Sequence, residues 1–128
     1  MAAQPAPHRP AEPARAAVVT KGVMRAAARL ELSNRMVAAA VGVSEATVSR
    51  MGGGGYQLEP GSKPYELAVL LLRLFRSLDA IVGGDVGVAR AWLRSPNTAL
   101  GATPLSLLES VTGLVNVVAY LDHRRALA

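Results

Sequence analysis

Cysteine is absent from the 128-residue sequence, so disulfide bonds, thiolate metal sites and a cysteine nucleophile are excluded. A chain without disulfides suits a reducing compartment, and we expect the protein to be cytoplasmic. Long hydrophobic runs are also missing. The longest, Leu67 to Leu72, is far shorter than the ~20 residues needed to span a bilayer, so we expect no membrane partner.

Residues that carry catalysis or bind metals are sparse. The two histidines, His8 and His123, lie near opposite ends of the chain without a second ligand at a suitable spacing, so we expect no metal site. Gly61, Ser62 and Lys63 follow a glycine run, but no strand precedes them and their order does not match a phosphate-binding loop. The sequence therefore predicts a protein that is not an enzyme and binds no cofactor.

The spacing of apolar residues is helical along most of the chain, and strand-like alternation never persists. This spacing predicts an all-α protein, in which a small helix-turn-helix bundle is followed by a compact helical domain. Composition suggests a disordered tail rich in proline and alanine at residues 1–17, a helix-turn-helix domain at 18–51, a glycine-rich linker at 52–63 and the second domain at 64–128.

Serine, aspartate, proline and glycine residues mark the expected helix ends. Ser33 and Ser44 predict the N-caps of two short helices separated by Gly42, and the glycines 52–55 are expected to end the second of them. Further helices are expected from Val18 to Leu30, from Pro64 to Val82, from a cap at Asp85 to Leu93, from Thr103 and Pro104 onward, and from Thr112 to Arg125.

The most informative motif lies between Asn34 and Met51. A helix-turn-helix needs small, flexible and apolar residues at fixed positions, and Ala38 and Gly42 supply the small residue and the left-handed turn. The positions that must face the shared core are apolar: Val37, Val41, Val43, Val48 and Met51. This match predicts DNA binding; the alternative is a similar helix pair in a protein that never binds DNA.

The outer face of the second short helix carries short polar and charged side chains that suit a DNA groove. Arg50 is placed to reach guanine or a phosphate, and Arg35 to contact the DNA backbone. The expected DNA-binding residues are Arg35, Ser44, Glu45, Thr47, Ser49 and Arg50. Because Arg50 is the only basic residue on this face, we expect a homodimer that reads two half-sites.

Positive charge is concentrated in the first half of the chain. The net charge of +5 divides into +4 for residues 1–63 and +1 for residues 64–128. A polyanionic partner such as DNA would explain the excess, because basic residues release condensed counterions when they neutralise phosphates. A basic surface that only aids solubility explains it equally well.

The helix expected from Pro64 is apolar on more than one side, with Arg73, Arg76 and Asp79 forming a narrow polar strip. Such a helix is either surrounded by others or buried against a second subunit. The apolar residues of the last helix raise the same two alternatives.

From Ala91 onward, the order of residues resembles the C-terminal toxin-binding domain of Xre/MbcA/ParS-type antitoxins. The resemblance rests on Trp92, Leu93, Pro96, Asn97, Leu100, Gly101, Pro104, Leu105, Leu107, Leu108, Gly113, Val117 and Leu121. Together with the preceding helix-turn-helix, it covers about Ala17 to Arg125.

The resemblance implies an antitoxin that inhibits a cognate toxin, typically an NAD-degrading RES-domain toxin, and that represses its own operon by binding operator DNA. In the family the C-terminal region docks on the toxin, which assigns toxin contacts to Asp122, His123, Arg124, Arg125, Leu127 and Ala128. Trp92, Leu100, Gly101, Pro104 and Gly113 would shape the domain. The alternative is a stand-alone dimeric helix-turn-helix transcriptional regulator.

Overall fold

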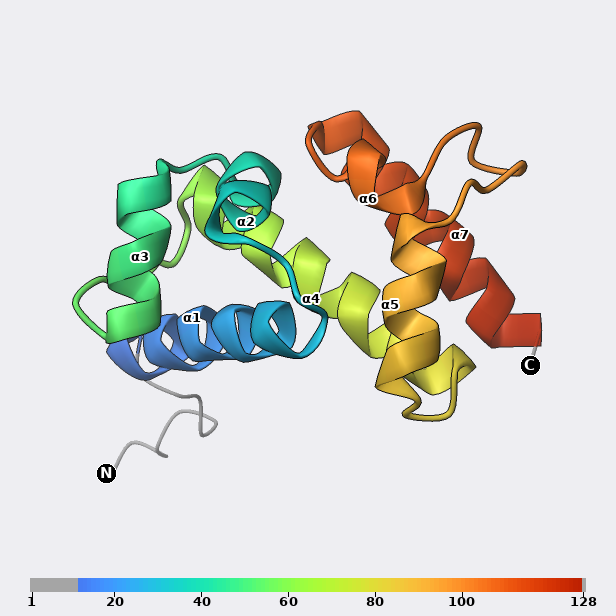
Figure 1. Ribbon diagram of the computed structural model, residues 1–128. Helices are drawn as coiled ribbons and strands as arrows, with labels where there is room; N and C mark the ends of the chain where they lie inside the picture. The colour runs from blue at the N-terminus through green and yellow to red at the C-terminus, as the bar shows by residue number, and fades with distance from the viewer. Residues whose placement is uncertain (1–11, 128) are drawn as a thin grey trace, which may run out of the picture.

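The computed structural model of the protein describes residues 12–127, which form seven helices and no strand (Figure 1). This architecture confirms the all-α prediction, and none of the described helices is long and apolar enough to cross a membrane. The helices are α1 (Glu12–Arg29), α2 (Asn34–Val41), α3 (Glu45–Gly53), α4 (Lys63–Ile81), α5 (Val86–Arg94), α6 (Pro104–Leu107) and α7 (Val111–Leu127).

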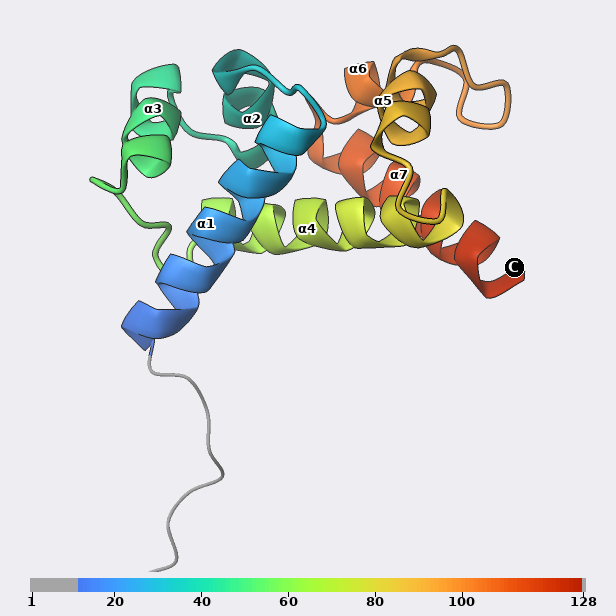
Figure 2. The ribbon, with the colours of Figure 1, turned by 60° about the horizontal axis from the view of Figure 1, so that its bottom comes forward.

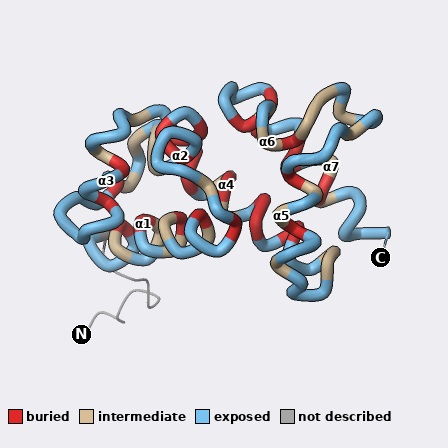
Figure 3. The backbone as a smooth tube through the Cα atoms, in the orientation of Figure 1, coloured by how far each residue is buried: buried red, intermediate tan, exposed pale blue. Residues whose placement is uncertain are grey.

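Helix α4 is the central element. It runs along most of the molecule, with α1 crossing one end and α7 packed along the other (Figure 2). Its buried residues belong to one hydrophobic core together with residues of the neighbouring helices. Figure 3 marks the buried stretches of these helices in red. The buried residues of α4 are Leu67, Ala68, Leu71, Leu74, Phe75, Ser77 and Leu78. Helices of the same chain therefore cover most of its broad apolar surface.

The predicted helix caps are confirmed. The hydroxyl oxygens of Ser33 and Ser44 accept hydrogen bonds from the first-turn amides of α2 and α3, each over 3.1 Å. A carboxylate oxygen of Asp85 does the same for α5 over 3.1 Å. Each cap satisfies an amide that has no partner within the helix and contributes about 1 kcal/mol.

The start of α1 and the end of α3 differ from the prediction, and the other helix ends lie within two residues of it. Helix α1 begins at Glu12 rather than Val18, because Pro13 is tolerated in a first helical turn and the alanine-rich residues after it favour a helix. Residues 1–11 of the expected tail lie outside the described residues. Helix α3 continues through Gly52 and Gly53, since a helical glycine costs only about 1 kcal/mol relative to alanine.

The glycine-rich segment between α3 and α4 is attached to α1. Leu58 within it is completely buried, and its backbone amide donates a 2.9 Å hydrogen bond to the hydroxyl oxygen of Thr20. Helix α4, which follows the segment, packs on α1 and α2 as well as on α7. The segment therefore leads into a helix that is shared by both halves of the molecule.

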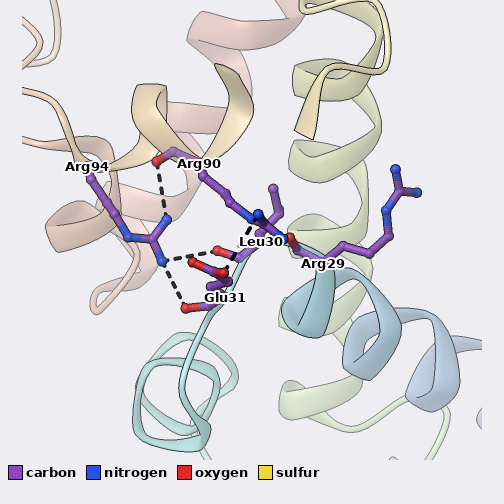
Figure 4. A network of polar contacts seen from close by, with 5 residues as sticks. All are labelled: Arg29, Leu30, Glu31, Arg90 and Arg94. Carbon is purple, nitrogen blue, oxygen red and sulfur yellow. Dashed lines mark hydrogen bonds and ion pairs between the residues drawn. The ribbon is translucent and has the colours of Figure 1, made fainter. Parts of the chain in front are cut away.

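Two arginines of α5 cap the C-terminal end of α1 (Figure 4). The Nε atom of Arg90 donates to the carbonyl oxygen of Arg29 over 2.7 Å. One terminal nitrogen of Arg94 donates to the carbonyl oxygens of Leu30 and Glu31 over 3.0 and 2.8 Å. These carbonyls have no partner within α1, and the negative end of the helix dipole attracts cations. We call this set of contacts the arginine cap.

Glu31 has a left-handed backbone at this junction, with a φ of 57°. That conformation costs a residue with a Cβ atom about 1–2 kcal/mol. The arginine cap offsets part of this cost, because Arg94 bonds the Glu31 carbonyl and a terminal nitrogen of Arg90 lies 3.7 Å from the Glu31 carboxylate. The turn after α1 is therefore fixed by a helix that lies about 60 residues later in the sequence.

In the second half, helix packing leaves no room for a side chain at Gly113. A Cβ atom on Gly113, in the first turn of α7, would lie 2.0 Å from the carbonyl oxygen of Leu107 in α6. The hydroxyl oxygen of Ser110 accepts a 3.0 Å hydrogen bond from the Gly113 amide, so the backbone cannot move away without losing this cap. Gly113 therefore sets how closely α6 approaches α7.

We predict that Gly113→Ala destabilises the protein by ~1–3 kcal/mol or more, the usual cost of overpacking a filled interior. Gly53→Ala is the matched control, because Gly53 is also helical and a Cβ atom there meets nothing within 4 Å. The control should be neutral or stabilising by up to ~1 kcal/mol. Urea denaturation followed by circular dichroism measures both changes, and equal stability of the two variants would contradict the packing argument.

Candidate functional site

Helices α2 and α3 form the predicted helix-turn-helix. Gly42 has a left-handed φ of 77°, and its amide donates to the carbonyl oxygen of Ala38 over 2.9 Å. This αL cap ends α2 and turns the chain toward Ser44, the N-cap of α3. The predicted core positions Val37, Val41, Val48 and Met51 are buried, and Val43 is half-buried.

Three predicted DNA-binding residues are joined in one hydrogen-bonded row on α3. The hydroxyl groups of Ser44 and Thr47 lie 2.9 Å apart, and a terminal nitrogen of Arg50 donates to the Thr47 hydroxyl oxygen over 3.1 Å. Arg50 is exposed and has five N–H donors, so the bond to Thr47 leaves donors available for a ligand. These hydrogen bonds hold the Arg50 guanidinium along the surface of α3. The arginine side chain therefore loses less conformational entropy when it binds a ligand.

Tyr56 also holds the arginine and is absent from the predicted site. The Arg50 guanidinium carbon lies 5.9 Å from the centre of the Tyr56 ring, within the range of a cation–π contact. Tyr56 follows the glycine run. The path of this run back across α3 cannot be predicted from helical periodicity. The pairing is therefore visible only in the three-dimensional structure.

The remaining predicted DNA-binding residues are exposed. Glu45 lies in the first turn of α3, Ser49 one turn later, and Arg35 in the first turn of α2. The helical repeat places Glu45 and Ser49 on one side of α3. Arg35 comes from a different helix, α2, and not from the hydrogen-bonded row of Ser44, Thr47 and Arg50.

Five of the six predicted toxin contacts lie on the last two turns of α7, and one of these, Asp122, is half-buried against α4. The carboxylate of Asp122 forms an ion pair with Arg73 and accepts a 2.9 Å hydrogen bond from the Ser77 hydroxyl. The Ser77 residue is only 1% exposed, so this bond satisfies a buried donor on α4. Asp122 therefore holds α7 against α4.

The residues that follow Asp122 on α7 face solvent. His123, Arg124, Arg125 and Leu127 are all exposed, whereas Ala128 lies outside the described residues. The guanidinium of Arg124 lies 5.9 Å from the ring centre of Tyr120, which is stacked on Trp92 of α5 with ring centres 6.2 Å apart. The end of α7 is thus an exposed basic surface next to a pair of aromatic rings.

Two hollows lie beside the arginine cap, where the two halves of the molecule meet. One, of about 230 Å³, lies between α1, α4 and α5, with Leu30 and Val86 in its walls. The other, of about 290 Å³, lies between α2 and α6, with Met36 and Leu108 in its walls. The halves are therefore joined mainly through α4 and the arginine cap, since side chains do not fill the space on either side.

Comparison with protein families agrees with this division of the molecule. Residues 9–73, just over half of the chain, match the antitoxin Xre-like helix-turn-helix domain. Residues 77–126 match the antitoxin Xre/MbcA/ParS C-terminal toxin-binding domain. The chain belongs to the Xre/MbcA/ParS-type antitoxins. Among proteins of curated function, none matches this sequence.

The family matches confirm the resemblance seen in the sequence and favour an antitoxin over a stand-alone regulator. They indicate a toxin and DNA as the classes of partner for this antitoxin. Antitoxin and helix-turn-helix families are typically non-enzymatic, in agreement with the expectation that the protein acts by binding. The boundary between the two matches falls inside α4, so one continuous helix carries both domains.

We predict that Asp122→Ala destabilises the antitoxin by ~1–3 kcal/mol, because the buried Ser77 hydroxyl loses its acceptor. The exposed ion pair with Arg73 should add little to this loss. Asp122→Asn keeps an acceptor oxygen and should recover most of the stability, and Glu109→Ala, at an exposed acid, should change it by less than ~0.5 kcal/mol. Urea denaturation distinguishes the three variants; a wild-type midpoint for Asp122→Ala would show that this contact does not hold α7.

Proposed function

We propose that this antitoxin inhibits a RES-domain toxin that degrades NAD, and that it represses its own operon in the cytoplasm as a homodimer. The observation that carries the proposal is the distance between two binding faces. Helix α3 and the C-terminal end of α7 lie at opposite ends of the molecule (Figure 1). Toxin and DNA would therefore not compete for the same surface.

The DNA face supports a regulatory role. Arg50 would contact a guanine edge or a phosphate, while Ser44 and Thr47 hold it in place and Ser49 approaches the groove. A single arginine gives one subunit a modest electrostatic contribution to binding. A homodimer would double the contacts by placing two copies of α3 in successive major grooves, which explains why we include dimerisation in the proposal.

The toxin face needs no catalytic group. The exposed residues His123, Arg124, Arg125 and Leu127 of α7 would cover the entrance of the toxin active site, with Ala128 continuing the contact. Asp122 contributes to inhibition indirectly, since it fixes the base of this segment on α4. The NAD-degrading chemistry of the partner rests on the family resemblance alone.

We expect Arg50→Ala to weaken binding to DNA from upstream of the gene and to reduce the slope of log affinity against log salt by about one unit per subunit. Arg125→Ala removes the same charge at the opposite end of the molecule and is the matched control. Fluorescence anisotropy over a salt titration measures both affinities. The DNA-binding assignment fails if the two variants bind DNA equally well.

Truncation of the chain after Asp122 should abolish protection against the toxin. This variant keeps the buried Leu121 and the Asp122 contacts but removes residues 123–128. The measurement is growth of cells that express the adjacent reading frame together with either form of the antitoxin. DNA binding of the truncated chain reports that it remains folded. Full rescue by the truncated chain would disprove the proposed toxin contacts, and absence of growth arrest by the neighbour alone would disprove its role as the toxin.

A further inference from the structure

The stacked pair Trp92 and Tyr120 belongs to a larger apolar surface formed by two helices. Val88 lies one turn before Trp92 on α5 and is 50% exposed, although it is a large apolar residue. On α7, Arg124 follows one turn after Tyr120, and Leu127, which is 71% exposed, follows Arg124. We call the five residues Val88, Trp92, Tyr120, Arg124 and Leu127 the α5–α7 surface.

The centre of this surface is rigid. Trp92 and Tyr120 are half-buried and pack against the hydrophobic core, and their rings are nearly parallel, with an interplanar angle of 16°. Arg124 lies over the Tyr120 ring, so its guanidinium is also restrained. Aromatic and arginine side chains that are already fixed lose little entropy when a partner covers them. Tryptophan, tyrosine and arginine are also the residues most enriched among interface hot spots.

The charges on the α7 side of the surface favour an acidic partner, whereas the acid on the α5 side, the exposed Asp85, caps the amide of Val88. Asp122, the nearest acid along α7, is paired with Arg73, whereas Arg124 and Arg125 are exposed. On α5 the two arginines are directed to the end of α1 by the arginine cap. A protein surface with an apolar depression and a carboxylate at its edge would match both the aromatic pair and Arg124.

We infer that the toxin docks on the α5–α7 surface, so that its contact extends beyond the end of α7 onto α5. This inference rests on the proposed function. The toxin is the favoured occupant because four of the five residues fall within the family's toxin-binding domain and the fifth, Leu127, directly follows it. The surface is also continuous with the exposed end of α7, so one partner can cover both.

Val88→Glu is the decisive variant. Val88 belongs to none of the predicted contacts of α7, and it is 50% exposed in the first turn of α5, where a glutamate suits the helix N-terminus. A carboxylate buried at the interface finds no basic group on an acidic partner, so binding of the purified product of the adjacent reading frame should weaken at least about tenfold. Val18→Glu is the matched control, since Val18 is 67% exposed on α1, in the other domain. Calorimetric titration of the full-length chain measures both affinities.

Trp92→Leu is a second variant, which keeps apolar volume against the core but removes the stack on Tyr120. It should also weaken the complex, and DNA binding by each variant checks its fold. Wild-type toxin affinity of folded Val88→Glu and Trp92→Leu overturns the inference. The proposed function still stands in that case if truncation after Asp122 abolishes rescue. If these variants keep wild-type toxin affinity but no longer sediment as a homodimer, the surface binds a second copy of this chain, and the inference is overturned too. Failure of the wild-type chain to bind the neighbour overturns both proposals.

Discussion

The burial of α4 is the constraint on which the rest of the structure depends. One side of this helix forms the core with α1, α2 and α3, and another side packs on α7. Residues such as Leu71, Leu74 and Leu78 have almost no exposed surface, and truncation of a buried leucine typically costs ~2–5 kcal/mol. Because α4 is continuous, the helix-turn-helix and toxin-binding domains of this antitoxin share one helix and are not joined by a flexible linker.

The arginine cap adds a second connection at a point where the core is incomplete. Arg90 and Arg94 of the toxin-binding domain bond the end of α1, which belongs to the helix-turn-helix domain, and hollows lie beside these bonds. The polar contacts thus fix the relative orientation of the two domains, which apolar packing alone does not fully determine. They also direct two positive charges of α5 to the junction between the domains, whereas Arg124 and Arg125 are exposed at the end of α7.

Much of the fold follows from local sequence signals. Ser33, Ser44 and Asp85 predict caps through a bond to a backbone amide three residues later, and Gly42 predicts a left-handed turn, because these preferences act over a few residues. The candidate site follows less completely. Asp122 resembles its exposed neighbours in sequence, yet it is held by residues of α4 about 45 positions earlier. Tyr56 is likewise separated from Arg50 by a glycine run whose path depends on the anchoring of Leu58.

The sequence by itself determined the helical class, the helix-turn-helix motif and the family of antitoxins, because periodicity, capping and motif spacing are local properties. The tertiary structure decided that α4 is a shared core helix, that Asp122 serves packing, and that Trp92, Tyr120 and Arg124 form one surface. Each of these outcomes depends on side chains from different helices meeting in space. These contacts depend on the packing of the whole chain, so no periodic or local pattern in the sequence indicates them.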